Sequence, residues 1–293
     1  RSAGWETVTV AGSHDWGEEL RVTTSEELGE RVVRIHRADL YFDRWEKHYC
    51  AEASDAFRTV LAEEAPDVVH VHHWIRLSSD LIARCGEASI PAVATLHDTW
   101  ATCLACFRVR GEERAACEAL LAQDPCATAC GETEPWWGGD DSRRGLALFR
   151  EAMQAEWDRT AALVTPSAAH ADLLARVTGR ERTEFTAVPH APFRRLERRT
   201  DGDRQAGEPL HIGCWGSVYP LKGTHVLIDA LARMEHVGGV RVSVLGEAVV
   251  PEYGEQVRSA ATGLPVTFHQ SFSADDLEMS DFDIAVLPSL CLE

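Results

Sequence analysis

Short apolar runs alternate with longer segments of helical periodicity along most of the chain. Val68–Val71 and Ala92–Leu96 are typical of the runs, because each is rich in apolar residues and follows a proline closely. Ala51–Glu64 is typical of the longer segments, with apolar residues that recur on one helical face. These are Ala53, Ala56, Phe57, Val60 and Leu61. Strands that alternate with helices predict an α/β fold of parallel sheets joined by helical crossovers.

The same pattern continues to the end of the chain and allows each element to be placed. The predicted strands are Thr7–Ala11, Val32–Ile35, Val68–Val71, Ala92–Leu96, Ala162–Thr165, Phe185–Val188, His211–Trp215, Val240–Leu245, Val266–His269 and Ile284–Pro288. The predicted helices are Ala51–Glu64, Leu77–Ala88, Leu146–Trp157, Ala168–Arg176, Thr224–Met234 and Glu252–Ala261, with Ser167 as the N-cap of the fourth. The economical interpretation is two Rossmann-like halves.

A polar, turn-rich stretch interrupts the pattern at Pro189–Pro209 and is the best domain boundary in the sequence. A chain of 293 residues is also longer than one core usually supports. We therefore predict a first domain over 1–189 with a Cys-rich insert at about 101–139. A linker over 190–208 and a second domain over 209–293 follow.

The charge balance restricts the partners. A formal net charge of −18 argues against a nucleic-acid surface, which needs clustered Lys and Arg. One basic cluster surrounds the linker and is either a solvated face or a patch that binds an anionic membrane surface or an acidic acceptor. It comprises Arg180, Arg182, Arg194, Arg195, Arg198, Arg199 and Arg204. Scattered cysteines suit a reducing compartment, so we expect a cytoplasmic protein, either free or at the inner face of the membrane.

The turn Cys214–Gly223 connects a predicted strand to a predicted helix and contains candidate phosphate ligands. Gly216 and Gly223 let backbone amides approach a ligand closely, and the N-terminus of the next helix favours anions. Lys222 adds a full positive charge. These groups could hold a diphosphate without a metal, although glycine-rich turns also serve packing alone. No Ser or Thr directly follows Lys222, so this is not a Walker loop.

Two further strand ends offer polar residues. His97 follows the strand Ala92–Leu96 and is either a hydrogen-bond donor to a sugar or phosphate oxygen or a structural residue. His72 and His73 point to opposite faces if their strand continues, which disfavours a metal site with three histidines. Glu293 lies five residues after Pro288 and is either a ligand-binding carboxylate or a solvated first-turn residue.

Taken in order, five segments resemble glycosyltransferase family 4. They are Pro66–His72, Val93–Asp98, Val164–Ser167, Gly216–Gly223 and Asp283–Glu293. Each segment is weak alone, and the five in order and spacing are specific. The resemblance implies a GT-B architecture of two Rossmann-like domains. It also implies a chain incomplete at both termini, without the family's first strand with its Gly-rich loop and without its second glutamate.

The resemblance assigns roles to individual residues. Lys222 would neutralise the donor diphosphate, His97 would contact the transferred sugar or its leaving phosphate, and Glu293 would bind sugar hydroxyls. The other implied site residues are Gly216, Ser217, Gly223 and Ser289 on the donor side and Asp98 and Trp100 on the acceptor side. Ser217 stands where many members carry Arg, and Pro189-His190-Ala191 stands where an Asn-Gly pair is usual.

Five clustered cysteines raise a separate question of metal binding. They are Cys103, Cys106, Cys117, Cys126 and Cys130. Two pairs at short spacing suit a zinc site with four of the five as ligands. The alternative is a set of reduced or loosely paired thiols. The sequence does not indicate a role in sugar transfer for a metal bound there.

The expected activity is retaining transfer of a hexose-type sugar from a nucleoside diphosphate, UDP or GDP, to a glycan or lipid acceptor. It would require no cofactor for catalysis. The alternatives are a catalytically silent module that binds a sugar nucleotide, a sugar-nucleotide epimerase on the same fold, and a metal-regulated interaction protein.

Overall fold

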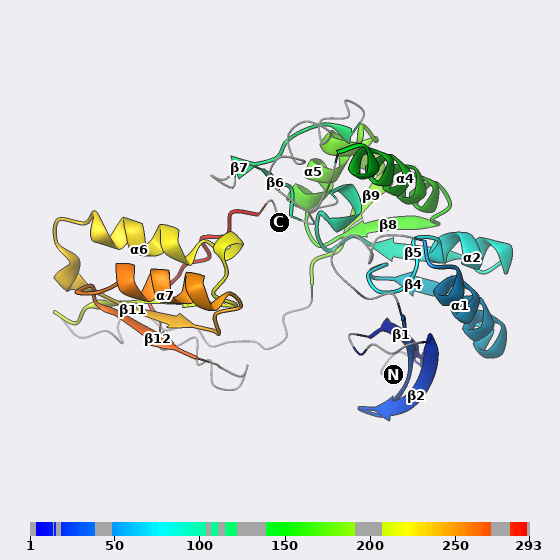
Figure 1. Ribbon diagram of the computed structural model, residues 1–293, viewed down its shortest axis with the longest axis horizontal. Helices are drawn as coiled ribbons and strands as arrows, with labels where there is room; N and C mark the ends of the chain where they lie inside the picture. The colour runs from blue at the N-terminus through cyan, green and yellow to red at the C-terminus, as the bar shows by residue number, and fades with distance from the viewer. Residues whose placement is uncertain are drawn as a thin grey trace. The chain divides into compact units, whose positions relative to one another are not determined.

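The computed structural model describes the chain as two compact units (Figure 1). The described residues are 4–13, 15, 19–38, 49–103, 107–110, 115–121, 139–190, 207–270 and 282–291, apart from the side chains of 110, 115 and 139–147. Unit 1 contains most of the chain up to His190, and unit 2 contains most of Ala191–Cys291.

Unit 1 contains two sheets. The first has the order β1-β3-β2, in which β1 pairs parallel with β3 and β2 pairs antiparallel. Its strands are β1 (Val8–Gly12), β2 (Arg21–Glu27) and β3 (Glu30–His36). The second sheet has the order β4-β5-β8-β9, with parallel pairs throughout. Its strands are β4 (Val69–Val71), β5 (Ala92–Thr95), β8 (Ala162–Thr165) and β9 (Phe185–Ala187).

Helices connect the parallel strands of unit 1, as the sequence predicts. They are α1 (Ala51–Glu64), α2 (Leu81–Glu87), α4 (Gly139–Asp158) and α5 (Ala168–Thr178). Shorter elements are the 3-10 turns η2 (Trp100–Thr102) and η4 (Arg182–Glu184) and the two-residue strands β6 (Val109–Arg110) and β7 (Ala115–Ala116). Ser167 is confirmed as the N-cap of α5, because its Oγ accepts the His170 N–H at 3.0 Å.

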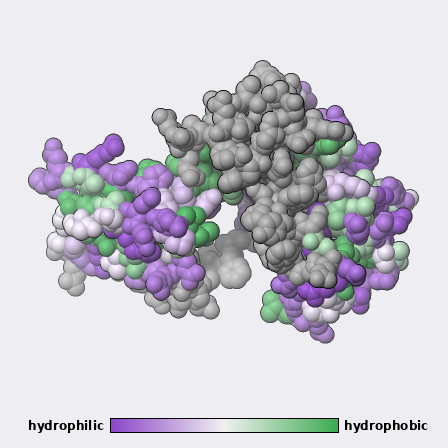
Figure 2. Space-filling model, in the orientation of Figure 1, coloured by the Kyte–Doolittle hydropathy of each residue, from purple (hydrophilic) through white to green (hydrophobic). Residues whose placement is uncertain are grey.

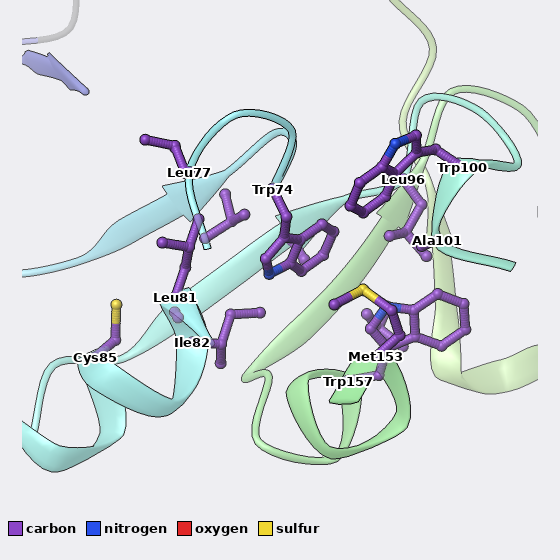
Figure 3. Packing of buried hydrophobic residues seen from close by; sticks show 14 of the residues in the cluster. Trp74, Leu77, Leu81, Ile82, Cys85, Leu96, Trp100, Ala101, Met153 and Trp157 are labelled. Carbon is purple, nitrogen blue, oxygen red and sulfur yellow. The ribbon is translucent and has the colours of Figure 1, made fainter. Parts of the chain in front are cut away.

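The core of unit 1 is built from apolar residues of its helices and strand ends. Figure 3 shows Trp74 and Trp100 above the α4 residues Met153 and Trp157, with Leu81 from α2 beside them. The rings of Trp74 and Trp100 are parallel, with centroids 6.4 Å apart. Both side chains follow strand ends, so this core supports the carboxyl edge of the second sheet.

Unit 2 is a four-stranded parallel sheet of order β12-β11-β10-β13. Its strands are β10 (Leu210–Trp215), β11 (Val240–Leu245), β12 (Val266–His269) and β13 (Ile284–Ala285). The remaining elements are the helices α6 (Thr224–Ala232) and α7 (Pro251–Ala260) and the 3-10 turns η5 (Pro220–Lys222) and η6 (Val237–Gly239). Successive right-handed crossovers in one direction place α6 and α7 on the same face, where they contact each other (Figure 1).

The exposed surface of the described residues is largely hydrophilic on the face drawn in Figure 2. A search of the described helices finds none with the length and apolar character that a bilayer crossing requires. Two arginines of the predicted basic cluster are engaged within unit 1. Arg180 pairs with Asp158 and Glu184, and Arg182 pairs with Asp172. The arginines from Arg194 to Arg204 lie outside the described residues.

Candidate functional site

Four histidines form a row at the carboxyl edge of the second sheet of unit 1. His70 lies in β4 and His72 follows that strand, while His97 follows β5 and His190 follows β9. Carboxyl ends of parallel strands meet at one edge of a sheet, which is where ligands of such sheets bind. Three strands therefore bring together imidazoles that are up to 120 positions apart in the sequence.

The imidazoles are in direct contact with one another. The His72 Nδ1 and His97 Nε2 atoms are 2.8 Å apart, and the His97 Nδ1 and His190 Nε2 atoms are 3.4 Å apart. The ring centroids of His97 and His190 are 5.1 Å apart and nearly parallel, and those of His70 and His72 are 4.0 Å apart. Hydrogen bonds thus join the rings of His72, His97 and His190, and the His70 ring contacts that of His72. We name these four residues the histidine row: His70, His72, His97 and His190.

The electrostatics of His70, His72 and His97 favour their neutral rings. Partial burial lowers the pKa of His70, and the neighbouring His72 lowers it further. Burial, followed by His190, lowers the pKa of His72. For His97, burial lowers the pKa first, then His72 and His190 do the same, while Asp98 acts in the opposite sense. Near neutral pH these rings are therefore uncharged and each offers one N–H donor and one bare nitrogen.

Asp98 is held beside the row by contacts from three directions. Its Oδ1 accepts the Trp100 N–H at 2.8 Å, and its backbone oxygen accepts the His170 Nε2–H at 3.2 Å. The His73 Nε2 lies 3.7 Å from Asp98 Oδ2. The Ile75 N–H donates to His73 Nδ1 at 3.0 Å, so Nε2 is the ring nitrogen of a neutral His73 that carries the proton. His73 therefore faces Asp98 as a donor.

Trp100, for which the resemblance implies a place on the acceptor side, is buried in the core of unit 1. Its side chain is only 3% exposed, and its ring packs edge-on against Phe149 with centroids 5.5 Å apart. The ring also contacts His73 edge-on at 4.7 Å. Trp100 supports the turn that contains Asp98 and His73.

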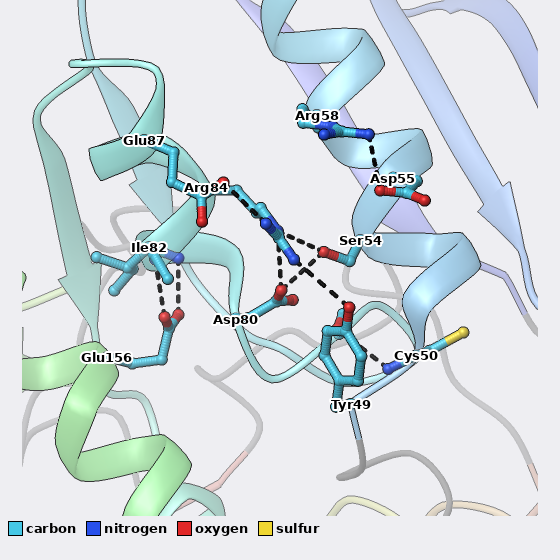
Figure 4. A network of polar contacts seen from close by, with 12 residues as sticks. Tyr49, Cys50, Ser54, Asp55, Arg58, Asp80, Ile82, Arg84, Glu87 and Glu156 are labelled. Carbon is cyan, nitrogen blue, oxygen red and sulfur yellow. Dashed lines mark hydrogen bonds and ion pairs between the residues drawn. The ribbon is translucent and has the colours of Figure 1, made fainter.

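A buried carboxylate, Glu156 of α4, holds the segment after β4 in place. It is 2% exposed and accepts three N–H donors: Trp74 Nε1 at 2.8 Å, Ile82 N at 2.7 Å and Ala83 N at 2.8 Å. Burial raises the pKa of Glu156, and these donors oppose the rise. Figure 4 shows the carboxylate below the start of α2, next to a network in which Asp80, Arg84 and Ser54 join α1 to α2. Glu156 therefore takes the place of a capping side chain for α2.

In unit 2, the predicted phosphate loop has a backbone that only glycine can supply. Gly216 has φ 120 and Gly223 has φ 69. A Cβ on Gly223 would lie 1.9 Å from the Pro288 oxygen, and one on Gly246 would lie 1.9 Å from the Gly216 oxygen. The loops after β10, β11 and β13 consequently touch through backbone atoms.

These loops meet where the strand order of the sheet reverses. From β10 the chain proceeds to β11 on one side, whereas β13 lies on the other side. Such a switch point is where open parallel sheets bind ligands. The Leu290 N–H donates to the Leu221 oxygen at 2.8 Å, which holds the segment after β13 against η5. The Ser289 Oγ is buried there and has no hydrogen-bond partner within the described part of the chain. Lys222 is exposed at the end of η5, two residues before α6 begins.

Other predicted site residues are only partly described. Glu293, Cys106, Cys126 and Cys130 lie outside the described residues. Cys103 and Cys117 are buried, at 7% and 8% exposure. Within the described ranges, no group of three His, Cys, Asp or Glu side chains is arranged to hold a metal ion.

Sequence reasoning missed two parts of the site. His190 was noted only as a departure from the family pattern, and Glu156 was read as one residue of a helix. The alternation of strands and helices could have placed His190 beside His97, because both follow parallel strands. Nothing in the sequence distinguishes Glu156 from Glu151, the exposed glutamate of the same helix.

Comparison with known proteins identifies the family. The model of Glycosyltransferase Family 4 matches residues 1–191. A search of curated proteins gave no significant match. Among solved structures, the apo form of OtsA superposes with a TM-score of 0.55 and 10% identity, over 97% of this chain and 72% of OtsA. The starch synthase IV catalytic domain from Arabidopsis thaliana gives 0.51 and 14%, over 92% of this chain and 64% of that one.

HepE from Anabaena gives a TM-score of 0.50 and 16% identity, over 80% of this chain and 56% of HepE. Identities this low show the fold alone, and they confirm the predicted α/β class of the GT-B glycosyltransferases. The family model covers more than half of the chain, including β1 to β9. The chain therefore belongs to glycosyltransferase family 4.

Proposed function

We propose that the protein transfers a sugar from a nucleoside diphosphate donor, UDP or GDP, to a glycan or lipid acceptor with retention of configuration. The observation that carries the proposal is the switch point of unit 2, where the loops after β10 and β13 meet. Gly216 and Gly223 open the backbone there, α6 begins there, and Lys222 adds a cation. Backbone amides at a helix N-terminus and a lysine suit a diphosphate.

The hydroxyl of Ser289 supports the same assignment. A buried hydroxyl without a partner is costly unless another group satisfies it. A ligand oxygen at the switch point would do so. Ser217 stands at the loop position where many family members carry Arg. Lys222 therefore supplies the positive charge that such an arginine would help to provide.

The ligands of similar structures guide the choice of nucleotides to test. Starch synthase IV was solved with ADP and acarbose, and HepE was solved with UDP-glucose. The nucleotides in these two structures carry different bases. We therefore test ADP beside the two expected nucleotides, UDP and GDP.

In the proposed reaction, the bond between the anomeric carbon and the leaving phosphate oxygen breaks. The acceptor hydroxyl oxygen bonds to the same face of that carbon, and its proton passes to the leaving phosphate. Lys222 and the loop amides stabilise the charge that develops on the diphosphate. His97 contacts the transferred sugar or the leaving phosphate, and Asp98 lies on the acceptor side. Because Lys222 and the loop amides stabilise this charge without a divalent cation, we expect turnover to continue when EDTA removes such cations.

Thermal unfolding with each nucleotide tests the binding step. A ligand at about 100 times its Kd adds roughly 2.7 kcal/mol to the folded state. We expect a clear shift of the melting temperature with one nucleotide. No shift with any of the three would contradict the assignment of the switch point.

Lys222→Ala tests the catalytic step. An aligned charge-stabilising group is worth about 3–4 kcal/mol, so we expect turnover to fall roughly 100-fold or more. Arg233→Ala is the matched control, because Arg233 is an exposed cation at the other end of α6. Near-normal turnover for Lys222→Ala would sink the proposed role. Binding of a sugar nucleotide without turnover would favour a silent module, and turnover without acceptor would favour an epimerase.

A further inference from the structure

The histidine row contains more imidazoles than the proposed reaction uses. His97 alone has an assigned role, yet both of its ring nitrogens face another histidine. Those partners, His72 and His190, are exposed residues that follow β4 and β9. Neither side chain is needed to fill the core, so their contacts with His97 call for another explanation.

A chain of neutral imidazoles has a direction. Each neutral ring has one N–H and one bare nitrogen. If the His72 Nδ1 donates to the His97 Nε2, then the His97 Nδ1 must donate to the His190 Nε2. If the first hydrogen bond runs the other way, the second reverses as well. The tautomer of His97 is thus tied to the tautomers of both neighbours.

We propose that His72 and His190 are positioning residues that hold the His97 ring and fix which of its nitrogens carries the proton. The inference rests on the proposed function for the importance of His97, and on the contacts of 2.8 and 3.4 Å for the coupling. A ligand that approaches the row therefore meets a ring with a defined donor and a defined acceptor.

The coupling also ties His97 to pH. The titratable groups that act on it are His72 from the end of β4, His190 from the end of β9, His73 from the segment after β4, and its own neighbour Asp98. The three histidines disfavour a proton on His97, and Asp98 favours one. Removing His72 or His190 removes a positive charge that can form beside His97. The titration of His97 then moves to higher pH.

Matched substitutions separate hydrogen bonding from packing. The amide of Asn lies close to the position of the His Nδ1, and the amide of Gln lies close to that of the Nε2. His72→Asn and His190→Gln therefore keep a hydrogen-bonding group opposite His97. His72→Phe and His190→Phe keep a ring and lose the hydrogen bond. His236→Gln, at an exposed residue of unit 2, is the control for a general loss of histidine.

The first readout is NMR of the whole chain labelled with ¹⁵N-histidine, which reports the tautomer and titration of each ring without any activity. We expect one dominant His97 tautomer at neutral pH in the wild-type protein and in the Asn and Gln variants. In the Phe variants we expect a mixture. The His97 titration should move to higher pH in all four variants and stay unchanged in His236→Gln. An unaltered tautomer and titration in all four would overturn the proposal.

The second readout is kcat/KM for sugar transfer at the optimal pH. We expect a loss of about tenfold in each Phe variant, the value of one hydrogen bond, and near-normal rates in the Asn and Gln variants. The reverse order, with Phe active and Asn or Gln impaired, would mean that the rings only pack. Absence of nucleotide binding and turnover in the wild type would refute the proposed function, and the NMR titration would still decide the coupling.

Discussion

Replacing Glu156 should destabilise unit 1 far more than replacing any exposed glutamate of α4. The carboxylate is 2% exposed and accepts three N–H donors, from Trp74, Ile82 and Ala83. In Glu156→Leu all three donors stay buried and lose their acceptor. Each such loss costs about 1–3 kcal/mol, and the apolar side chain recovers part of the sum. We expect a net loss of about 3–5 kcal/mol, a large share of the stability of a typical domain.

Glu156→Gln should lose less stability, because the two carboxylate oxygens accept unequal numbers of hydrogen bonds. Oε2 accepts from both Trp74 and Ile82, and Oε1 accepts from Ala83 alone. A glutamine keeps two hydrogen bonds by placing its oxygen in the Oε2 position. Its amide N–H₂ then faces the Ala83 N–H, so we expect a loss of about 1–3 kcal/mol.

Urea unfolding followed by tryptophan fluorescence measures both losses, since Trp74 is buried at this site. Amide hydrogen exchange shows where the stability is lost. It should accelerate most at Ile82 and Ala83, in the first turn of α2. Glu151→Leu is the matched control on an exposed position of the same helix, with an expected change within about 0.5 kcal/mol. If the free energy of unfolding of Glu156→Leu lies within about 1 kcal/mol of the wild-type value, the reasoning from the three donors is wrong.

The geometry supports two further predictions, and the cysteine spacing in the sequence supports a third. Gly223→Ala should destabilise unit 2 by about 3 kcal/mol or more and abolish nucleotide binding, because the new Cβ would overlap a carbonyl oxygen at a position with positive φ. Gly238→Ala is the control, because a Cβ there meets open space, and it should leave the melting temperature and its shift with nucleotide unchanged. Burial lowers the pKa of His72 and His97 in the folded state, so the unfolded chain binds more protons and stability should fall as pH drops below 6.5; a flat stability profile between pH 7 and 5 would contradict this. If four of the cysteines within 103–130 hold zinc, the purified protein under reducing conditions should contain one equivalent by mass spectrometry, and absence of zinc or iron would remove that hypothesis.

The sequence predicts most elements of the fold because their hydrophobic periods are local. α1 has the predicted bounds, and its apolar face is the one that packs into the core. β2 was missed because all seven of its residues are exposed, which leaves no alternation to detect. It forms through hydrogen bonds to β3 alone.

The start of α2 was misplaced for a different reason. The periodicity begins at Leu77, whereas the helix begins at Leu81. Ser78 and Ser79 are buried before it, and Ser78 Oγ accepts the Cys50 N–H at 3.2 Å. The N–H groups of Ile82 and Ala83 are satisfied by Glu156, more than 70 positions away. A helix end that depends on such a distant residue cannot be read from the local pattern.

The two candidate sites differ in the same way. The turn from Gly216 to Gly223 is predictable because its conformation depends on the backbone, and glycine is the sequence mark of a positive φ. The histidine row lies in side chains from three strand ends, so it becomes visible only when the strand order is known. His97 looked solitary in the sequence and is the centre of the row in the structure.

This difference predicts which properties each site controls. Backbone amides and a lysine recognise phosphate regardless of the neighbouring side chains, so nucleotide affinity should depend on unit 2. Neutral imidazoles carry no net charge and hold an anion weakly, but they present directed donors and acceptors to hydroxyl groups. Variants of His72 and His190 should therefore leave the thermal shift caused by the nucleotide intact while lowering the rate of transfer. If a variant of either histidine loses nucleotide binding while its remaining histidines keep their normal tautomers, nucleotide affinity does not depend on unit 2 alone, and this prediction is wrong.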